Sequence, residues 1–272
     1  MQYMTSTVPS SSIRSLRSRP GKRAIFAGYR PGFRKAISSA FVLLAFLLFA
    51  GISAAESSSS VPTKDLRLDQ ILDRMEQHEN AQWASLRHYR AKRHYAVHYR
   101  GWAKTLEAEM DVEITYDASS GKTFLIVKQS GSQILCRKVL QRALDSEKEA
   151  SMDKRATALT QANYRFQLLG AEDLHGRSTY ILKVEPIAPS KFLYKGKIWV
   201  DAQEFAVAKM EVEPARNPSF WISRTIIDHS NAATDGFWLP LQNRSETKVR
   251  IGGTAVMTID YGPYELVPNG SN

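Results

Sequence analysis

Three short runs that alternate apolar and polar side chains lie between Gly176 and Pro214, and turn residues separate them. Successive side chains of a strand point to opposite faces, so a period of two predicts strands with one buried face and one solvated face. Pro186 and Pro189 break the pattern after the first run, and the stretch Asp201-Ala-Gln-Glu is typical of a hairpin turn. The segment therefore predicts an antiparallel meander with one apolar face to be covered.

The same alternation recurs along most of the chain and is strictest in residues 105–116, where every second residue is apolar. Further runs that predict strands cover residues 86–99, 123–129, 133–137, 163–169, 220–228, 244–251 and 254–261. Helical periods interrupt this order in residues 65–79 and 138–150, with a weaker piece in 152–159. The predicted fold class is α+β: a mainly antiparallel, curved sheet of about ten strands, with an N-terminal helix and a helical insertion covering its concave apolar side.

The first 55 residues have the composition of an export signal. They hold 8 basic residues and no acidic one, and an apolar core from Phe41 to Ile52 is followed by small residues. A basic segment, an apolar segment and a small-x-small end describe a secretory signal peptide, and we place its cleavage after Ala55. The alternative is an inner-membrane anchor, because residues 36–55 are long enough to span a bilayer. The sequence therefore predicts an exported, periplasmic protein.

The net charge of +10 comes mostly from this leader. Without its 8 basic residues the chain has 29 basic and 27 acidic residues, a net charge of +2. This balance gives no electrostatic reason to expect nucleic acid as a partner. The single cysteine, Cys136, excludes an internal disulfide.

Composition divides the chain into four parts. Residues 1–55 are the leader and signal peptide, 56–64 are a Ser-rich linker, 65–266 are a single domain and 267–272 are a flexible tail. The domain shows neither an internal repeat nor a shift in composition that would mark a boundary.

The sequence lacks the common signatures of catalysis and of metal or cofactor binding. It contains no G-x-S-x-G, H-E-x-x-H, C-x-x-C or G-x-G-x-x-G motif and no phosphate-binding loop. His88, His94 and His98 share one face of a predicted strand, where residues four apart are ~13 Å apart, too far to bind one ion. Zinc would be arguable only if this stretch were helical. We therefore predict a protein that is not an enzyme and has no cofactor and no metal.

The strongest positive signal is the amount of apolar side chain on one face of a single-layer sheet. A sheet of about ten strands tends to curl, and its concave side then needs filling. The helical segments either fill it as ordinary core or leave a cavity for an apolar ligand, and both possibilities stay open at this point. The residues that would line such a cavity are Leu106, Met110, Val112, Ile114, Tyr116, Tyr180, Leu182, Val184, Met210, Val212, Val249, Ile251, Met257 and Ile259.

The order of elements and three short motifs resemble a known superfamily. The order is signal peptide, amphipathic helix, meander, helical insertion and meander. The motifs are Asn163-Tyr-Arg-Phe, Gly196-Lys-Ile-Trp-Val-Asp and Phe237-Trp-Leu-Pro. Over residues 65–266 the chain resembles the LolA/LolB-like periplasmic lipoprotein carrier superfamily, which includes the RseB/MucB-type sensor domains.

The resemblance implies an unclosed β-barrel of about eleven antiparallel strands, with helices as a lid over an apolar cavity. It implies a carrier or sensor that binds an acyl chain of a lipoprotein or lipid without catalysis. The family gates its cavity with an arginine near the lid, and Arg93 is the candidate here. No cysteine follows the apolar core of the leader, so the chain is similar to the soluble carrier rather than to the membrane-anchored acceptor.

The expected partners follow from the same resemblance. They are the acyl chain, an envelope protein and, transiently, a membrane. The alternative function is an envelope protein-interaction or stress-sensing module that uses the same sheet as a docking surface.

Overall fold

The structure is a computed structural model, and it describes residues 66–152, 154–217 and 219–268. The chain divides into residues 1–58 and 59–272, and all described residues belong to the second unit. The predicted signal peptide, the alternative anchor and the linker therefore lie outside the described residues. In the described ranges, none of the helices is both long and apolar enough to cross a membrane.

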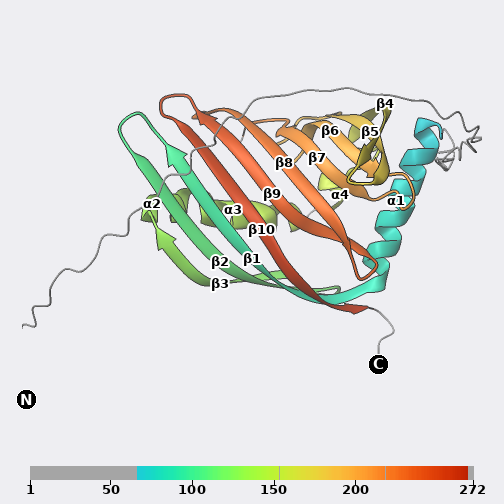
Figure 1. The fold of residues 1–272 in the computed structure, drawn as a ribbon, viewed down its shortest axis with the longest axis horizontal. Helices are drawn as coiled ribbons and strands as arrows, with labels where there is room; N and C mark the ends of the chain where they lie inside the picture. Colours follow the sequence, from blue (N-terminus) through green and yellow to red (C-terminus); the bar gives the residue numbers. More distant parts are fainter. Residues whose placement is uncertain (1–65, 153, 218, 269–272) are drawn as a thin grey trace, which may run out of the picture. The chain divides into compact units, whose positions relative to one another are not determined.

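Within these residues, ten antiparallel strands form one sheet with two free edges (Figure 1), in the order β3-β2-β1-β10-β9-β8-β7-β6-β5-β4. The strands are β1 (Leu86–Arg100), β2 (Thr105–Asp117), β3 (Gly121–Gly131), β4 (Tyr164–Leu174), β5 (Arg177–Pro186), β6 (Tyr194–Asp201), β7 (Val207–Pro214), β8 (Ile222–Thr234), β9 (Phe237–Val249) and β10 (Thr254–Pro268). The last strand returns to pair with the first. The predicted unclosed antiparallel sheet with an N-terminal helix and a helical insertion is confirmed.

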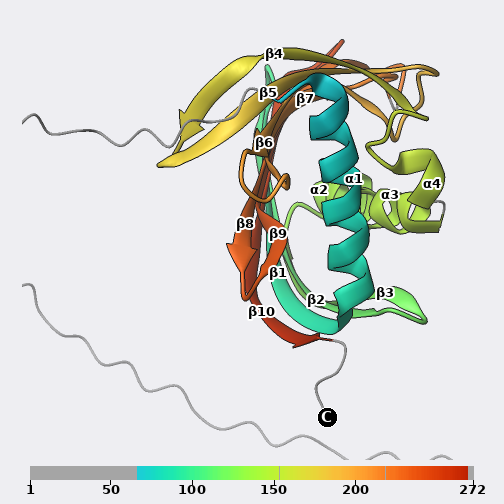
Figure 2. The ribbon, with the colours of Figure 1, turned by 90° about the vertical axis from the view of Figure 1, so that its right-hand side faces the viewer.

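The helices all lie on one side of the sheet, which we call the inner face (Figure 2). They are α1 (Leu68–Ser85), α2 (Gln133–Leu135), the π-helical turn η1 (Cys136–Leu140), α3 (Gln141–Met152) and α4 (Lys154–Thr157). In α1 the buried residues are Ile71, Leu72 and Met75, whose spacing of one and three places them on one helical stripe. The segment from α2 to α4, which we call the insertion, lies between β3 and β4, the two edge strands of the sheet.

The alternation in residues 105–116 becomes the two faces of β2. Ala108, Met110, Val112, Ile114 and Tyr116 are all buried on the inner face, and the acidic residues between them point outward. Each large apolar side chain buried in this way contributes about 1.5–3 kcal/mol. The hydrophobic effect thus selects the inner face.

Residues 133–137 were predicted as a strand, and this prediction is wrong: they form α2 and the start of η1. Gly131 ends β3 with φ of +84°, a conformation that favours glycine. Ser132 then caps the helix by accepting a hydrogen bond from the backbone N–H of Leu135, at 3.5 Å. Cys136, Leu140 and Leu144 are four residues apart and all buried, so they lie on one face of a helix. Burial of this helical face outweighs the short alternating run in residues 133–137.

Trp199 lies on the outer face, as the alternation predicted, yet it is buried there. Its indole Nε1 donates a hydrogen bond to Glu172 of β4, and the Lys209 ammonium lies 5.0 Å from the ring centroid. Glu172 can reach it because β4 continues to Leu174, beyond the predicted end of this strand at residue 169. The indole is therefore a structural contact within the outer face.

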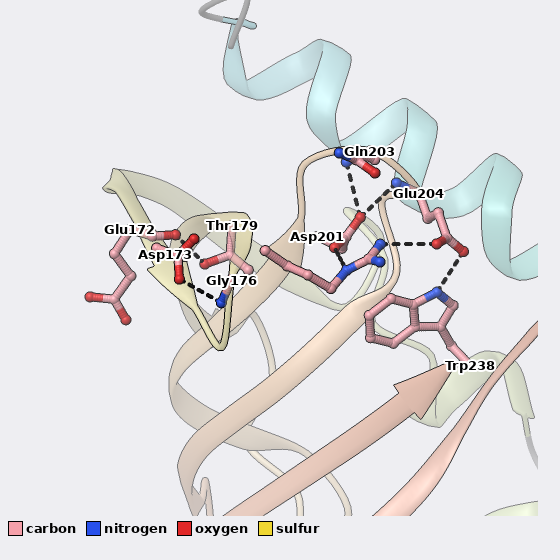
Figure 3. A network of polar contacts seen from close by, with 9 residues as sticks. Glu172, Asp173, Gly176, Thr179, Asp201, Gln203, Glu204 and Trp238 are labelled. Carbon is pink, nitrogen blue, oxygen red and sulfur yellow. Dashed lines mark hydrogen bonds and ion pairs between the residues drawn. The ribbon is translucent and has the colours of Figure 1, made fainter. Parts of the chain in front are cut away.

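A buried carboxylate fixes the turn between β6 and β7 (Figure 3). The Asp201 side chain accepts hydrogen bonds from Arg177 Nε at 2.6 Å and from the backbone N–H groups of Gln203 and Glu204, at 3.0 and 2.8 Å. The Glu204 carboxylate accepts from Arg177 at 2.9 Å and from Trp238 Nε1 at 2.7 Å. Burial alone would raise the pKa of Asp201, but Arg177 and the backbone donors outweigh it and lower the pKa.

The C-terminal part of α1 is attached to the start of β9 by a side-chain amide. Gln82 Nε2 donates to the carbonyl oxygen of Trp238 at 3.1 Å, and Gln82 Oε1 accepts from the Trp238 backbone N–H at 2.6 Å. The network of Figure 3 and this pair of bonds share Trp238, so they hold α1, β5, β9 and the β6–β7 turn together.

Candidate functional site

In the described part of the chain, the inner face carries two clusters of buried apolar side chains. The first lies under η1 and α3 and includes Tyr89, Tyr95, Val97, Met110, Val112, Ile114, Tyr116, Leu135, Cys136, Leu140, Leu144, Leu239 and Ile259. The second lies under α1 and includes Leu66, Ile71, Leu72, Met75, Tyr164, Tyr180, Leu182, Val184, Ile198, Val200, Phe205 and Val212. The helices therefore pack against the apolar side chains of the inner face.

The predicted lining residues distribute over both clusters. Met110, Val112, Ile114, Tyr116 and Ile259 belong to the first, with Leu106 and Met257 packed at its margin. Tyr180, Leu182, Val184 and Val212 belong to the second, with Met210 at its margin. Val249 is half-buried at the end of β9.

Ile251 lies away from the inner face. The strand β9 ends at Val249, whose backbone N–H donates to the carbonyl oxygen of Gly253 at 3.0 Å and closes a hairpin turn. Ile251 is in that turn and is 80% exposed. The alternating pattern continues past the strand end because the turn happens to hold an apolar residue at the next matching position.

A polar strip on β8 and β9 separates the two clusters. His229 lies opposite both Asn243 and Met210, and Asn243 lies opposite Ile259, so these residues share the inner face. His229 Nδ1 accepts from the Asn243 side-chain amide at 3.3 Å, and Nε2 donates to Asn231 Oδ1 at 3.1 Å. Burial lowers the pKa of His229, so the ring is neutral at pH 7.

Arg93 of β1 is a buried cation on the inner face. The Arg93 side chain is 2% exposed, and its guanidinium makes two contacts with the Glu147 carboxylate of α3, at 2.6 and 3.3 Å. Lys122 Nζ lies 3.0 Å from the same carboxylate. Arg93 also donates to the Tyr95 hydroxyl at 3.3 Å and lies 4.6 Å from the ring centroid of Tyr261. An ion pair thus attaches the insertion to the sheet.

One N–H donor of the Arg93 guanidinium makes no hydrogen bond within the described residues. Its Nε is buried and has no hydrogen-bond partner among the described residues. Buried donors of this kind are rare because an unmade hydrogen bond costs about 1–3 kcal/mol. The donor is therefore a place where a polar acceptor would be stabilised.

The sequence alone placed Arg93 on the inward face of β1 but did not single out Glu147. The available signal was the helical spacing of Leu140, Leu144 and Glu147, which puts a carboxylate on the buried stripe of the insertion. An acidic residue on the apolar stripe of a helix predicts a buried partner of opposite charge.

The Glu147 carboxyl titrates well below its usual range. Burial alone would raise its pKa, but Lys122 and Arg93 outweigh that effect and lower the pKa to about 2. A carboxyl whose pKa is lower in the folded state than in the unfolded chain stabilises the fold above the unfolded value of 4.5. That stabilisation is lost as the pH falls through the folded value.

We expect this effect in the pH dependence of stability. The free energy of unfolding of the wild type should exceed that of Glu147→Gln by roughly 3 kcal/mol above pH 5, and the difference should shrink between pH 4.5 and 2. Urea unfolding at a series of pH values measures it. A difference that stays constant down to pH 2 would contradict the ion pair.

Hollows in the described part of the sheet include the following two. One, of about 500 Å³, lies over β5 to β8 and is lined by both signs of charge, among them Lys183, Glu211 and Arg224. The other, of about 210 Å³, lies where β9 and β10 separate beyond the pair Gln242–Asp260. Its lining includes Leu239, Pro240, Tyr261, Pro263 and Tyr264, and the Tyr264 hydroxyl donates to the Pro240 carbonyl at 2.8 Å. The second hollow therefore adjoins inner-face residues.

Comparison with known proteins finds likeness in solved structures. No family model matches the chain, and the search of curated proteins finds no match. A DUF1329 family protein from Desulfovibrio piger is 13% identical, with a TM-score of 0.38 over 75% of this chain and 94% of that one. A proposed outer membrane lipoprotein-sorting protein domain from Vibrio parahaemolyticus is 10% identical, with a TM-score of 0.39 over the same shares.

A LolA superfamily protein from Nitrosomonas europaea is 14% identical, with a TM-score of 0.34 over 74% of this chain and 94% of that one. The superfamily that the sequence resembles is thus among the structures found.

Proposed function

We propose that this protein is a carrier or sensor that holds an acyl chain of a lipid or lipoprotein on the inner face of its sheet. The observation that carries the proposal is the Arg93–Glu147 ion pair, which attaches a separate helical insertion to a broad apolar surface. In this arrangement the insertion is closed over the first cluster. The ligand would bind to that cluster, either in place of the insertion or between the insertion and the sheet.

The connectivity favours an insertion that can move. The insertion begins after β3 and ends before β4. These are the two edge strands, so the insertion crosses the inner face from one free edge to the other. Its helices contribute side chains to the first cluster but no strand to the sheet. The insertion can therefore open while all nine strand pairings of the described sheet stay intact.

The energetics favour a long acyl chain as the ligand. Opening exposes the apolar side chains that Leu135, Leu140 and Leu144 now cover. An acyl chain returns ~0.8 kcal/mol for each buried CH₂, so eight such groups offset about 6 kcal/mol of exposure. The polar end of the chain would find the Arg93 guanidinium, including the Nε that has no partner among the described residues.

Ligand binding tests the proposal directly. Native mass spectrometry of the purified protein should show a co-purifying lipid, and the delipidated protein should bind a fluorescent fatty acid. Met257→Glu places a charge at the margin of the first cluster and should weaken that binding at least tenfold, whereas Asp260→Asn, an exposed outer-face residue of the same strand, should not. Thermal unfolding of both variants shows whether the fold persists. A folded wild type that binds no fatty acid would overturn the proposal.

The ion pair provides a second test with the opposite sign. Glu147→Gln weakens the closed arrangement but leaves Arg93 in place, so the open arrangement becomes more populated. The affinity for the fatty acid should then rise, about tenfold for each 1.4 kcal/mol by which closure is weakened. If the inner face were ordinary core, the same variant would lose stability without gaining affinity.

A further inference from the structure

Three loops meet at one end of the sheet. They are the β1–β2 turn (residues 100–104), the β7–β8 connection (215–217 and 219–222 in the described ranges) and the β9–β10 turn (249–253). Arg100 pairs with Thr254 and Ile222 pairs with Val249, so the three loops are neighbours along the sheet. The β1–β2 and β9–β10 hairpins project from the same end in Figure 1. We call these residues the rim.

The rim exposes large apolar side chains at its tips. Trp102 is 95% exposed and Phe220 is 75% exposed, and Trp221 and Ile251 are exposed as well. Single exposed apolar residues are common on protein surfaces, but here four lie on three adjacent loops. They lie on turns and loops at the strand ends, and none of the four lines either of the hollows described above.

The charge of the rim has one sign. Its residues include Arg100, Lys104, Arg216 and Arg250, and no acidic residue occurs in the same ranges. In the part of the chain that the structure describes, none of these four cations forms an ion pair. The rim is thus basic, although the chain beyond the leader has a net charge of only +2.

Hydrogen bonds hold the rim in shape. Arg250 donates from its backbone N–H to the Trp221 carbonyl at 2.8 Å and from Nε to the Phe220 carbonyl at 2.7 Å. The Gly101 N–H donates to the Lys104 carbonyl at 2.9 Å and closes the β1–β2 turn. The Phe220 and Trp221 rings contact each other edge to face, with centroids 5.6 Å apart. The exposed side chains are therefore presented by ordered turns.

We propose that the rim docks on the surface of an anionic lipid bilayer. Tryptophan prefers the interface between headgroups and acyl chains, where its ring is buried and its N–H is hydrated. Lysine and arginine beside it are attracted to anionic headgroups, and each improves partitioning roughly fivefold. An acidic protein would match the charge of the rim, but the two exposed tryptophans, Trp102 and Trp221, favour the headgroup interface of a bilayer. This proposal does not depend on a ligand at the inner face.

Site-specific labels in the full chain test the docking. In a Cys136→Ala background, Ile251→Cys places an environment-sensitive nitrobenzoxadiazole label on the rim. Leu125→Cys places the same label on β3, where Leu125 pairs with Glu113 of β2. Glu113 lies eight residues along β2 from Thr105, next to the rim, so the label is about 26 Å from the rim. Any attachment through the leader is common to both proteins. The control site is also exposed and apolar, at 63%.

On vesicles of equal parts phosphatidylglycerol and phosphatidylcholine, the label at position 251 should shift to shorter wavelength and be quenched by bilayer-embedded doxyl lipids. The label at position 125 should not change. Lys104→Gln and Arg216→Gln should each reduce the quenched fraction of the rim label, by roughly fivefold in partitioning, and 1 M salt should do the same. Pure phosphatidylcholine should give weaker quenching.

Two results would overturn the proposal. The first is a rim label that stays in water on vesicles that carry the protein, and the second is equal quenching at both positions. If the rim label stays in water on vesicles but becomes buried when polyglutamate is added, the rim is a protein-docking surface and the membrane proposal fails.

Discussion

Replacing Glu147 by alanine is expected to lower the free energy of unfolding by about 3–5 kcal/mol, the usual cost of removing one partner of a buried ion pair. The variant leaves the Arg93 guanidinium, whose side chain is 2% exposed, without its carboxylate. Lys122, which contacts the same carboxylate, has the same sign as Arg93 and cannot replace Glu147. Urea unfolding at pH 7 measures the loss.

The matched control removes the other partner. Arg93→Met should cost less than about 2 kcal/mol, because Glu147 keeps Lys122 at 3.0 Å and its side chain is 29% exposed to water. Methionine also fills the apolar space next to Tyr261. The loss of stability should thus be larger for Glu147→Ala than for Arg93→Met, because Arg93 is buried more deeply than Glu147. Equal losses in the two variants, or a larger loss in Arg93→Met, would contradict it.

Replacing Asp201 by alanine is expected to cost about 3 kcal/mol. The side chain is 1% exposed and accepts from Arg177 Nε and from two backbone N–H groups (Figure 3). The two backbone groups would lose this acceptor, and Arg177 would keep only Glu204. The lost bonds come from Gln203 and Glu204, which directly precede Phe205, and Phe205 has a φ of +60°, a conformation unfavourable for a residue other than glycine. Thermal and urea unfolding both measure the loss.

Asp201→Asn distinguishes the stability contributed by the hydrogen bonds of the turn from that contributed by the ion pair with Arg177. Asparagine keeps the oxygen that accepts from Gln203 and Glu204 but loses the ionic contact with Arg177, which is 41% exposed at its side chain. The loss should therefore fall to about 1 kcal/mol. If asparagine costs as much as alanine, the ion pair rather than the turn is the main contribution.

Much of the fold could be predicted from alternation and helical spacing. Residues 105–116 identified a strand and its buried face, because a period of two leaves one arrangement that removes Met110, Val112 and Ile114 from water. The same logic placed Trp199 on the outer face and Arg93 on the inner one. These are local properties, since each side chain's direction follows from its position within one element.

Local patterns failed where a turn or a cap outweighed them. Residues 133–137 alternate, yet Ser132 begins a helix there. Ile251 continues the alternation of β9, yet the hairpin closes two residues earlier. In both cases, hydrogen bonds at the end of an element decide its boundary, and the spacing of apolar residues contains little information about them.

The sequence by itself determined that this chain forms an antiparallel sheet with one apolar face and helices to cover it, because burying that face is the largest favourable term available to the chain. Only the tertiary structure decided that β1 pairs with β10, that Glu147 reaches Arg93 from 54 residues away, and that three loops form one basic, apolar rim. Contacts of this kind depend on how distant elements pack, and a pattern confined to neighbouring residues does not specify them.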